Sequence, residues 1–164
     1  MKPAKPGSTA VVFAAIFVGW FALDRVTKEA VDVVPPGTLI GQGIPGLFDF
    51  RLVHNTGAAW GILGDSTFLL GLFSCLVCAG IVFYLFGFRH ARATLSETIP
   101  LAFVFAGGLG NAVDRLTYGY VIDFIETTFI SFPVFNIADI GVTCGIIAFI
   151  LAMLIQMKRM PADG

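Results

Sequence analysis

Four long stretches of the chain carry no charged residue, and this spacing of charge constrains the fold more than any other feature. The stretches are residues 6–23, 66–88, 98–113 and 140–157. A helix needs about 20 largely apolar residues to cross the hydrocarbon core of a membrane. The stretches that follow Glu97 and Asp139 reach this length when those two carboxylates lie at the membrane interface. The pattern predicts transmembrane helices at about residues 8–27, 67–88, 96–114 and 137–158.

The composition agrees with a membrane protein. Of the 164 residues, 57% are hydrophobic and 13% are charged, whereas soluble domains contain about 25% charged residues. A soluble domain of this size has too much surface for its volume to bury so many apolar side chains. The composition therefore disfavours a disordered chain, a nucleic-acid binder and a typical cytosolic enzyme. The length predicts a single membrane domain spanning residues 1–164.

Basic residues predict the orientation, because they concentrate in the cytoplasmic segments of membrane proteins. Four spans place six of the ten basic residues on one side of the membrane. These six are Lys2, Lys5, Arg89, Arg92, Lys158 and Arg159. We therefore expect a multi-pass membrane protein with both termini in the cytoplasm. The extracytoplasmic loops are then residues 29–65 and 115–136.

Both outer loops contain strand-like sequence. Apolar and charged residues alternate over residues 47–53, which is the period of a half-buried strand. Residues 120–125 and 128–135 are rich in β-branched and aromatic types, whereas glycine-rich residues 41–46 are typical of a connector. The predicted fold is an α-helical integral membrane protein with four transmembrane helices and a small extracytoplasmic β-sheet subdomain.

The predicted topology brings several charged residues to the outer membrane face. Ionisable groups at membrane depth are costly and usually face a bundle interior or a wet cavity. A cluster of carboxylates with counter-ions at one depth therefore indicates an active site. The carboxylates are Asp24, Asp114, Asp123 and Asp139, and the counter-ions are Lys28 and Arg115.

Most of these charges also have a structural interpretation. Asp24 and Lys28 have the i, i+4 spacing of a helical ion pair. The consecutive Asp114 and Arg115 are typical of an interfacial helix end.

The expected helix start at residues 136–139 also has a structural interpretation, whereas Asp123 has none. Asn136 and Asp139 fit a helix N-cap followed by an acidic first turn. Asp123, by contrast, interrupts the apolar segment 121–125, where an unpaired carboxylate costs several kcal/mol. Two neighbouring carboxylates suit metal-free hydrolysis, because one stays protonated while the other takes a proton from water. Asp123 and Asp139 suit this role because only a short loop separates them.

Other chemistries have weaker support in the sequence. His54 and His90 fall on opposite sides of the predicted membrane, which argues against a histidine metal site. The Cys75 and Cys78 pair falls inside a span, where small apolar packing is the favoured interpretation. The glycines around Gly108 have the small-residue spacing that permits close approach of helices.

Taken together, five motifs resemble those of the bacterial lipoprotein signal peptidases, also called signal peptidase II or prolipoprotein signal peptidase. They cover nearly the whole chain and occur in the family's order. They are Asp24 to Lys28, Asn55 to Trp60, Gly107 to Arg115, Gly119 to Phe124, and Phe132 to Asp139.

The resemblance implies an intramembrane aspartic endopeptidase that cuts prolipoproteins just before a cysteine carrying diacylglycerol. It implies catalytic roles for Asp123 and Asp139, close to the outer leaflet of the bacterial cytoplasmic (inner) membrane, and no metal or other cofactor. Substrate-binding or supporting roles are implied for Asp24, Lys28, Asn55, Gly57, Gly108, Asn111, Asp114, Arg115, Asn136 and Ala138. It also implies contact with membrane lipid and binding of the cyclic peptide globomycin.

Two other classes of function use the same residues. A small proton- or ion-coupled transporter would employ the carboxylates as a relay. Such a relay places ionisable groups near the middle of the membrane, whereas here they gather at one end. A non-catalytic scaffold would give the five polar motifs no purpose.

Overall fold

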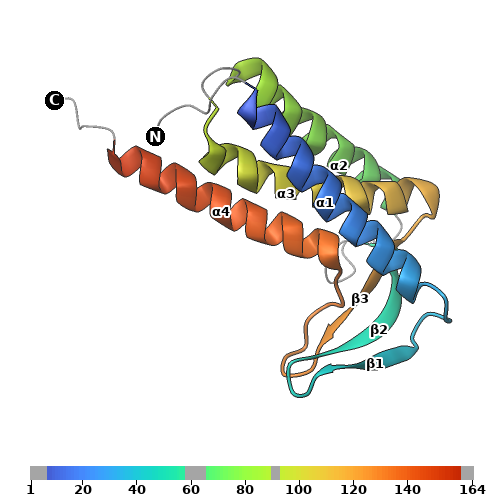
Figure 1. Cartoon of the computed structure of the whole chain (residues 1–164). Coiled ribbons are helices and arrows are strands. Elements are labelled where there is room, and N and C mark those ends of the chain that lie inside the picture. The colour runs from blue at the N-terminus through green and yellow to red at the C-terminus, as the bar shows by residue number, and fades with distance from the viewer. Residues whose placement is uncertain (1–6, 58–65, 90–92, 160–164) are drawn as a thin grey trace.

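Four long helices lie alongside one another, and a small sheet covers one end of them (Figure 1). The computed structural model describes residues 7–57, 66–89 and 93–159. The helices are α1 (Ser8–Val31), α2 (Thr67–Val82) continued by the π-helical turn η2 (Phe83–Phe88), α3 (Leu95–Thr117) and α4 (Ile137–Arg159). The sheet lies where α1 and α3 end and α4 begins, so the polar ends of three helices face it (Figure 1).

Within the described ranges, three segments are long and apolar enough to cross a membrane: Ser8–Val31, Thr67–Phe88 and Ile137–Lys158. Many of their large apolar side chains are exposed on the isolated chain, among them Val11, Phe73 and Ile147. Lipid covers such surfaces without cost, whereas water does not. The expected membrane fold, helical with a small sheet, is confirmed.

The helix α3 is the central element of the bundle, because it packs against α1, α2 and α4. Small residues make this possible. A side chain at Gly107 would meet the main-chain carbonyl oxygen of Ala138. A Cβ at Gly110 would lie 2.6 Å from a carboxylate oxygen of Asp24. The close helix approach that the glycine spacing predicts is therefore present.

The sheet is formed by two of the connections between helices, the one from α1 to α2 and the one from α3 to α4. Its strands β1 (Leu39–Ile44), β2 (Phe48–Asn55) and β3 (Val121–Thr127) are antiparallel in the order β1-β2-β3. The strands predicted within residues 47–53 and 120–125 are confirmed. The β2–β3 register places Val53 opposite Asp123, and Leu52 is completely buried beneath the sheet.

Two expectations about the loops are wrong. Residues 41–46 are largely strand β1 rather than a connector, because the chain reverses only at Gly46, whose φ of 77° suits glycine. Residues 128–135 form no strand beyond one bridge between Ile125 and Phe135. Pro133 lies in this segment and has no N–H to donate to a ladder.

Two helices are longer than their apolar stretches. The helix α1 extends from the expected end at residue 27 to Val31, and α3 extends from residue 114 to Thr117. The reason lies in the charges of these last turns. Lys28 and Asp114 pair with each other in the protein interior, so neither charge needs to leave the bundle.

Candidate active site

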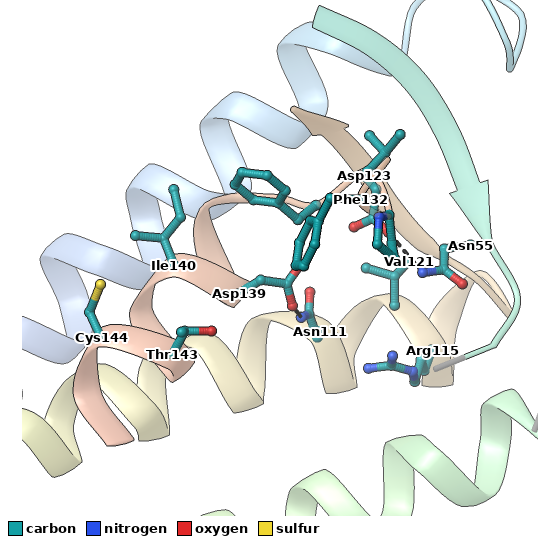
Figure 2. Close-up of a pocket in the computed structure, with 13 residues that line it drawn as sticks. Asn55, Asn111, Arg115, Val121, Asp123, Phe132, Asp139, Ile140, Thr143 and Cys144 are labelled. Carbon is teal, nitrogen blue, oxygen red and sulfur yellow. Dashed lines mark hydrogen bonds between the residues drawn. The ribbon is translucent and has the colours of Figure 1, made fainter. Parts of the chain in front are cut away.

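Two carboxylates from different elements line one cavity of about 400 Å³. Asp123 comes from the middle of β3 and Asp139 from the first turn of α4. Figure 2 shows both side chains in the space between the strand and the helices, with Asn111 beside Asp139. The other polar lining residues are Asn55, Asn111, Arg115 and Thr143, and the remainder are mainly apolar.

The position of Asp139 follows from how α4 begins. The side-chain oxygen of Asn136 accepts a hydrogen bond from the Asp139 N–H at 3.0 Å. The Asp139 carboxylate in turn accepts one from the Asn136 N–H at 3.1 Å. This reciprocal pair is a capping arrangement and confirms the helix start predicted from the sequence. Asp139 therefore caps the helix with one oxygen and presents the other to Asn111, whose amide donates to it at 2.8 Å.

Asp123 is held by two side-chain amides. Asn136 donates to one carboxylate oxygen at 2.7 Å, and Asn55, at the end of β2, donates to the other at 2.9 Å. Only 2% of Asp123 is exposed. Burial, together with the neighbouring charge of Asp139, raises the pKa of Asp123 to about 7 against the lowering effect of both amides. A carboxyl group with this pKa still holds its proton in much of the population at neutral pH.

A buried ion network lies directly behind the cavity. Lys28 contacts Asp24 at 3.0 Å and Asp114 at 2.8 Å, and all three side chains are fully buried. Arg25 contacts the same two carboxylates, at 3.3 Å and 2.6 Å. The ion pair predicted from the Asp24 and Lys28 spacing is therefore present, within a network of two cations and two anions.

Arg25 is the residue of this network that sequence reasoning missed. Its signal was present, because it precedes Lys28 by three residues and shares one helix face with it. Arg115, predicted as a counter-ion, lines the cavity together with Asp123 and Asp139 and donates to the carbonyl of Gly57 at 3.4 Å. The acid beside it in sequence, Asp114, pairs with Arg25 and Lys28.

The other predicted residues lie around this centre. The Gly57 N–H donates to Asn55 at 3.0 Å, and the Ala138 N–H donates to Asp24 at 3.1 Å. Gly108 faces α2 rather than the cavity, since a Cβ there would meet the sulfur of Cys78 at 3.3 Å. The rest of the second motif, residues 58–60, lies outside the described residues.

Neither histidine joins this centre among the described residues. His54 lies 2.7 Å from a carboxylate oxygen of Asp32 and stacks on Tyr120. His90 lies outside the described residues. In the ranges that the structure covers, no group of three or more His, Cys, Asp or Glu side chains is placed to hold a metal ion.

The fold and the cavity define a multi-pass membrane protein with a buried acidic site at one end of its helix bundle. The chain belongs to the signal peptidase II family, because the model of "Signal peptidase (SPase) II" matches residues 16–155. Relatives named lipoprotein signal peptidase include one from Streptococcus pneumoniae (strain ATCC BAA-255 / R6). It is 33% identical over 144 residues, which is 87% of this chain and 92% of the relative. Another, from Parasynechococcus marenigrum (strain WH8102), is 37% identical over 79% of this chain and 80% of its own length.

Solved structures show the same fold. A bacterial membrane enzyme determined by the in meso method at 2.3 Å has a TM-score of 0.81 and 28% identity. The match covers 99% of this chain and 98% of that chain. A second bacterial membrane enzyme, determined by the same method at 1.9 Å, has a TM-score of 0.75 and 29% identity, over 93% and 96% of the two chains.

Proposed function

We propose that the protein is an intramembrane aspartic endopeptidase that removes signal peptides from diacylglyceryl-modified prolipoproteins. It cuts N-terminal to the lipidated cysteine, with Asp123 and Asp139 activating water. One observation carries the chemistry: two carboxylates from separate elements line the same small cavity. The substrate class follows from the family and from the relatives named lipoprotein signal peptidase.

The two carboxylates have different tasks in this mechanism. Asp139 accepts two hydrogen bonds at the positive end of a helix dipole, which favours its ionised form. Two neighbouring carboxylates share one proton, and we assign it to Asp123, whose pKa burial raises to about 7. Asp139 takes a proton from water as the water oxygen attacks the scissile carbonyl carbon. Asp123 gives its proton to the carbonyl oxygen, which becomes a hydroxyl.

Collapse of this tetrahedral intermediate completes the cycle. The C–N bond breaks, the amine of the lipidated cysteine takes the proton held by Asp139, and Asp123 recovers its own proton from the hydroxyl. The signal peptide leaves with a free carboxyl group. No oxidant, metal or cofactor enters this balance.

The apolar side of the cavity suits a lipidated substrate. Beyond Asp139 the lining continues along α4 with Ile140 and along the preceding loop with Phe132 and Val134. Phe132 is 44% exposed on the isolated chain, so this side of the site opens toward the lipid. A signal peptide helix and two acyl chains enter here without crossing water. The cyclic peptide globomycin is expected to bind in the same cavity.

The distribution of charge supports an outer-leaflet site. The end of η2 and the C-terminal end of α4 lie at the opposite end of the bundle from β3 and the start of α4 (Figure 1). Arg89 directly follows η2 and Lys158 lies in the last turn of α4, whereas β3 and the first turn of α4 carry Asp123 and Asp139. Basic residues mark the cytoplasmic side. We therefore place the protein in the cytoplasmic membrane with both termini in the cytoplasm and the sheet outside.

Cleavage of a defined substrate tests this function. Purified protein in detergent is mixed with a prolipoprotein carrying diacylglyceryl-cysteine, and product is followed on a gel with the unlipidated precursor in parallel. We expect cleavage of the lipidated substrate alone, and its loss in Asp123→Asn and Asp139→Asn. Asp49→Asn, on β2 and outside the cavity lining, is the matched control and retains activity. A folded wild-type protein that fails to cleave, or a dyad variant that still does, would overturn the proposal.

A further inference from the structure

Lys28 makes one contact that its role in the ion network does not require. Its side chain is fully buried, and its ammonium group has three partners, which match its three N–H donors. Two partners are the carboxylates of Asp24 and Asp114. The third is the side-chain oxygen of Asn111, at 2.8 Å.

This third contact determines which way the Asn111 amide faces. The Asn111 oxygen accepts from Lys28 and, at 3.0 Å, from the Asn136 side chain. The NH2 group is consequently turned toward Asp139, to which it donates at 2.8 Å. The reversed amide would bring its NH2 group against an ammonium and a second NH2 group, and its oxygen against a carboxylate. All these contacts are repulsive, so Lys28, together with the Asn136 amide, selects one orientation.

Arg25 is the second cation of the ion network and serves as a comparison for Lys28. It contacts the same two carboxylates as Lys28 and balances their charge, yet no hydrogen bond joins it to Asn111 among those the structure gives it. Buried ion pairs are often no better for stability than apolar residues of similar volume. The contact with Asn111, which Lys28 makes in addition, therefore indicates a role at the cavity rather than in the stability of the bundle.

We propose that Lys28 is a positioning residue for the carboxylate pair: it fixes the Asn111 amide so that the amide directs a hydrogen bond to Asp139. The chain of contacts runs from α1 through α3 to the first turn of α4. This inference rests on the proposed function, since it explains how the ionised partner of the pair is held. The Lys28 charge also lowers the pKa of Asp123, so the same residue affects both carboxylates.

Other charged groups surround this chain of contacts, and each methionine variant of the test removes one cation and leaves the remaining groups in place. They are Asp24 and Arg25 from α1, Asp114 and Arg115 from α3, Asp123 from β3 and Asp139 from α4.

The test compares Lys28→Met with Arg25→Met, which removes the other cation of the network. Turnover and KM for a lipidated prolipoprotein are measured across pH, per folded enzyme, with thermal unfolding in parallel. For Lys28→Met we expect kcat to fall about 10- to 100-fold, the value of one hydrogen bond to a charged group. KM changes little, and the alkaline limb of the pH profile moves to higher pH because the Asp123 proton is held more tightly. Arg25→Met lowers the unfolding midpoint but leaves the pH profile in place.

A second variant keeps the inference testable if Lys28→Met does not fold. Asn111→Asp keeps an acceptor for Lys28 but cannot donate to Asp139, and we expect a similar fall in kcat. Wild-type kcat in Asn111→Asp, or an equal loss without a pH shift in both methionine variants, would refute the positioning role. Inactivity of the wild type toward this substrate would instead refute the proposed function, so the two failures are distinguishable.

Discussion

Asp114→Asn tests the buried ion network most directly. The two carboxylate oxygens of Asp114 contact Arg25 at 2.6 Å and Lys28 at 2.8 Å, and the side chain is fully buried. The asparagine keeps one acceptor but turns an NH2 group toward a cation. It also leaves the network with two positive charges against one negative. Breaking a buried pair in this way costs about 3–5 kcal/mol.

The matched control is Glu126→Gln on the sheet. Glu126 contacts Arg51 at 2.7 Å, but these side chains are 32% and 37% exposed. Such a pair contributes about 0–1 kcal/mol. Thermal unfolding in detergent, followed by far-UV circular dichroism, measures both variants. At about 2–4 °C per kcal/mol for a chain of this size, Asp114→Asn lowers the midpoint by about 6–20 °C. An unfolding midpoint no lower than that of Glu126→Gln would refute the predicted cost of breaking this buried ion pair.

Three further predictions concern the cavity, the sheet and the helix contacts. The rate of cleavage falls as pH rises through about 7, because Asp123, with its raised pKa, loses its proton there. A stopped assay from pH 5 to pH 9, about two units on either side of that pKa, measures the fall. Leu52→Ala removes a completely buried side chain and destabilises the protein by about 2–5 kcal/mol, which a thermal melt detects. Gly107→Ala forces α3 and α4 apart, because the new methyl group meets a main-chain carbonyl, and it lowers both the unfolding midpoint and activity. Gly80→Ala is its control, since a Cβ there meets nothing within 4 Å and alanine favours the helix by about 1 kcal/mol.

The charge-free stretches were sufficient to predict the helices, and the charges that end them indicated where the candidate site lies. The chain must bury or cover its apolar stretches, so the number of helices follows from them. The four predicted spans put Asp123 and Asp139 on the same side of the membrane, and the structure brings both into one cavity. The cap formed by Asn136 and Asp139 was also predictable, because it is a local interaction between residues three apart.

The partners of these residues were less predictable, because they depend on tertiary packing. The contact of Lys28 with Asn111 joins residues 83 positions apart, and no local pattern encodes it. Strand β1 was missed because glycine-rich segments favour turns, and only pairing with β2 makes this segment extended. The segment 128–135 has strand-like composition, but beyond Phe135 it lacks a partner strand among the described residues.

The sheet has a consequence for biogenesis, because β1 and β2 come from the connection between α1 and α2, whereas β3 comes from the connection between α3 and α4. Strand β3, which carries Asp123, pairs along its length with β2, which is encoded some 70 positions earlier. Asp139 lies on the last helix of all. Asp123 and Asp139 can come together only after α4 has been synthesised and β3 has paired with β2. A nascent chain that still lacks α4 therefore also lacks the paired carboxylates, even while other newly made polypeptides surround it.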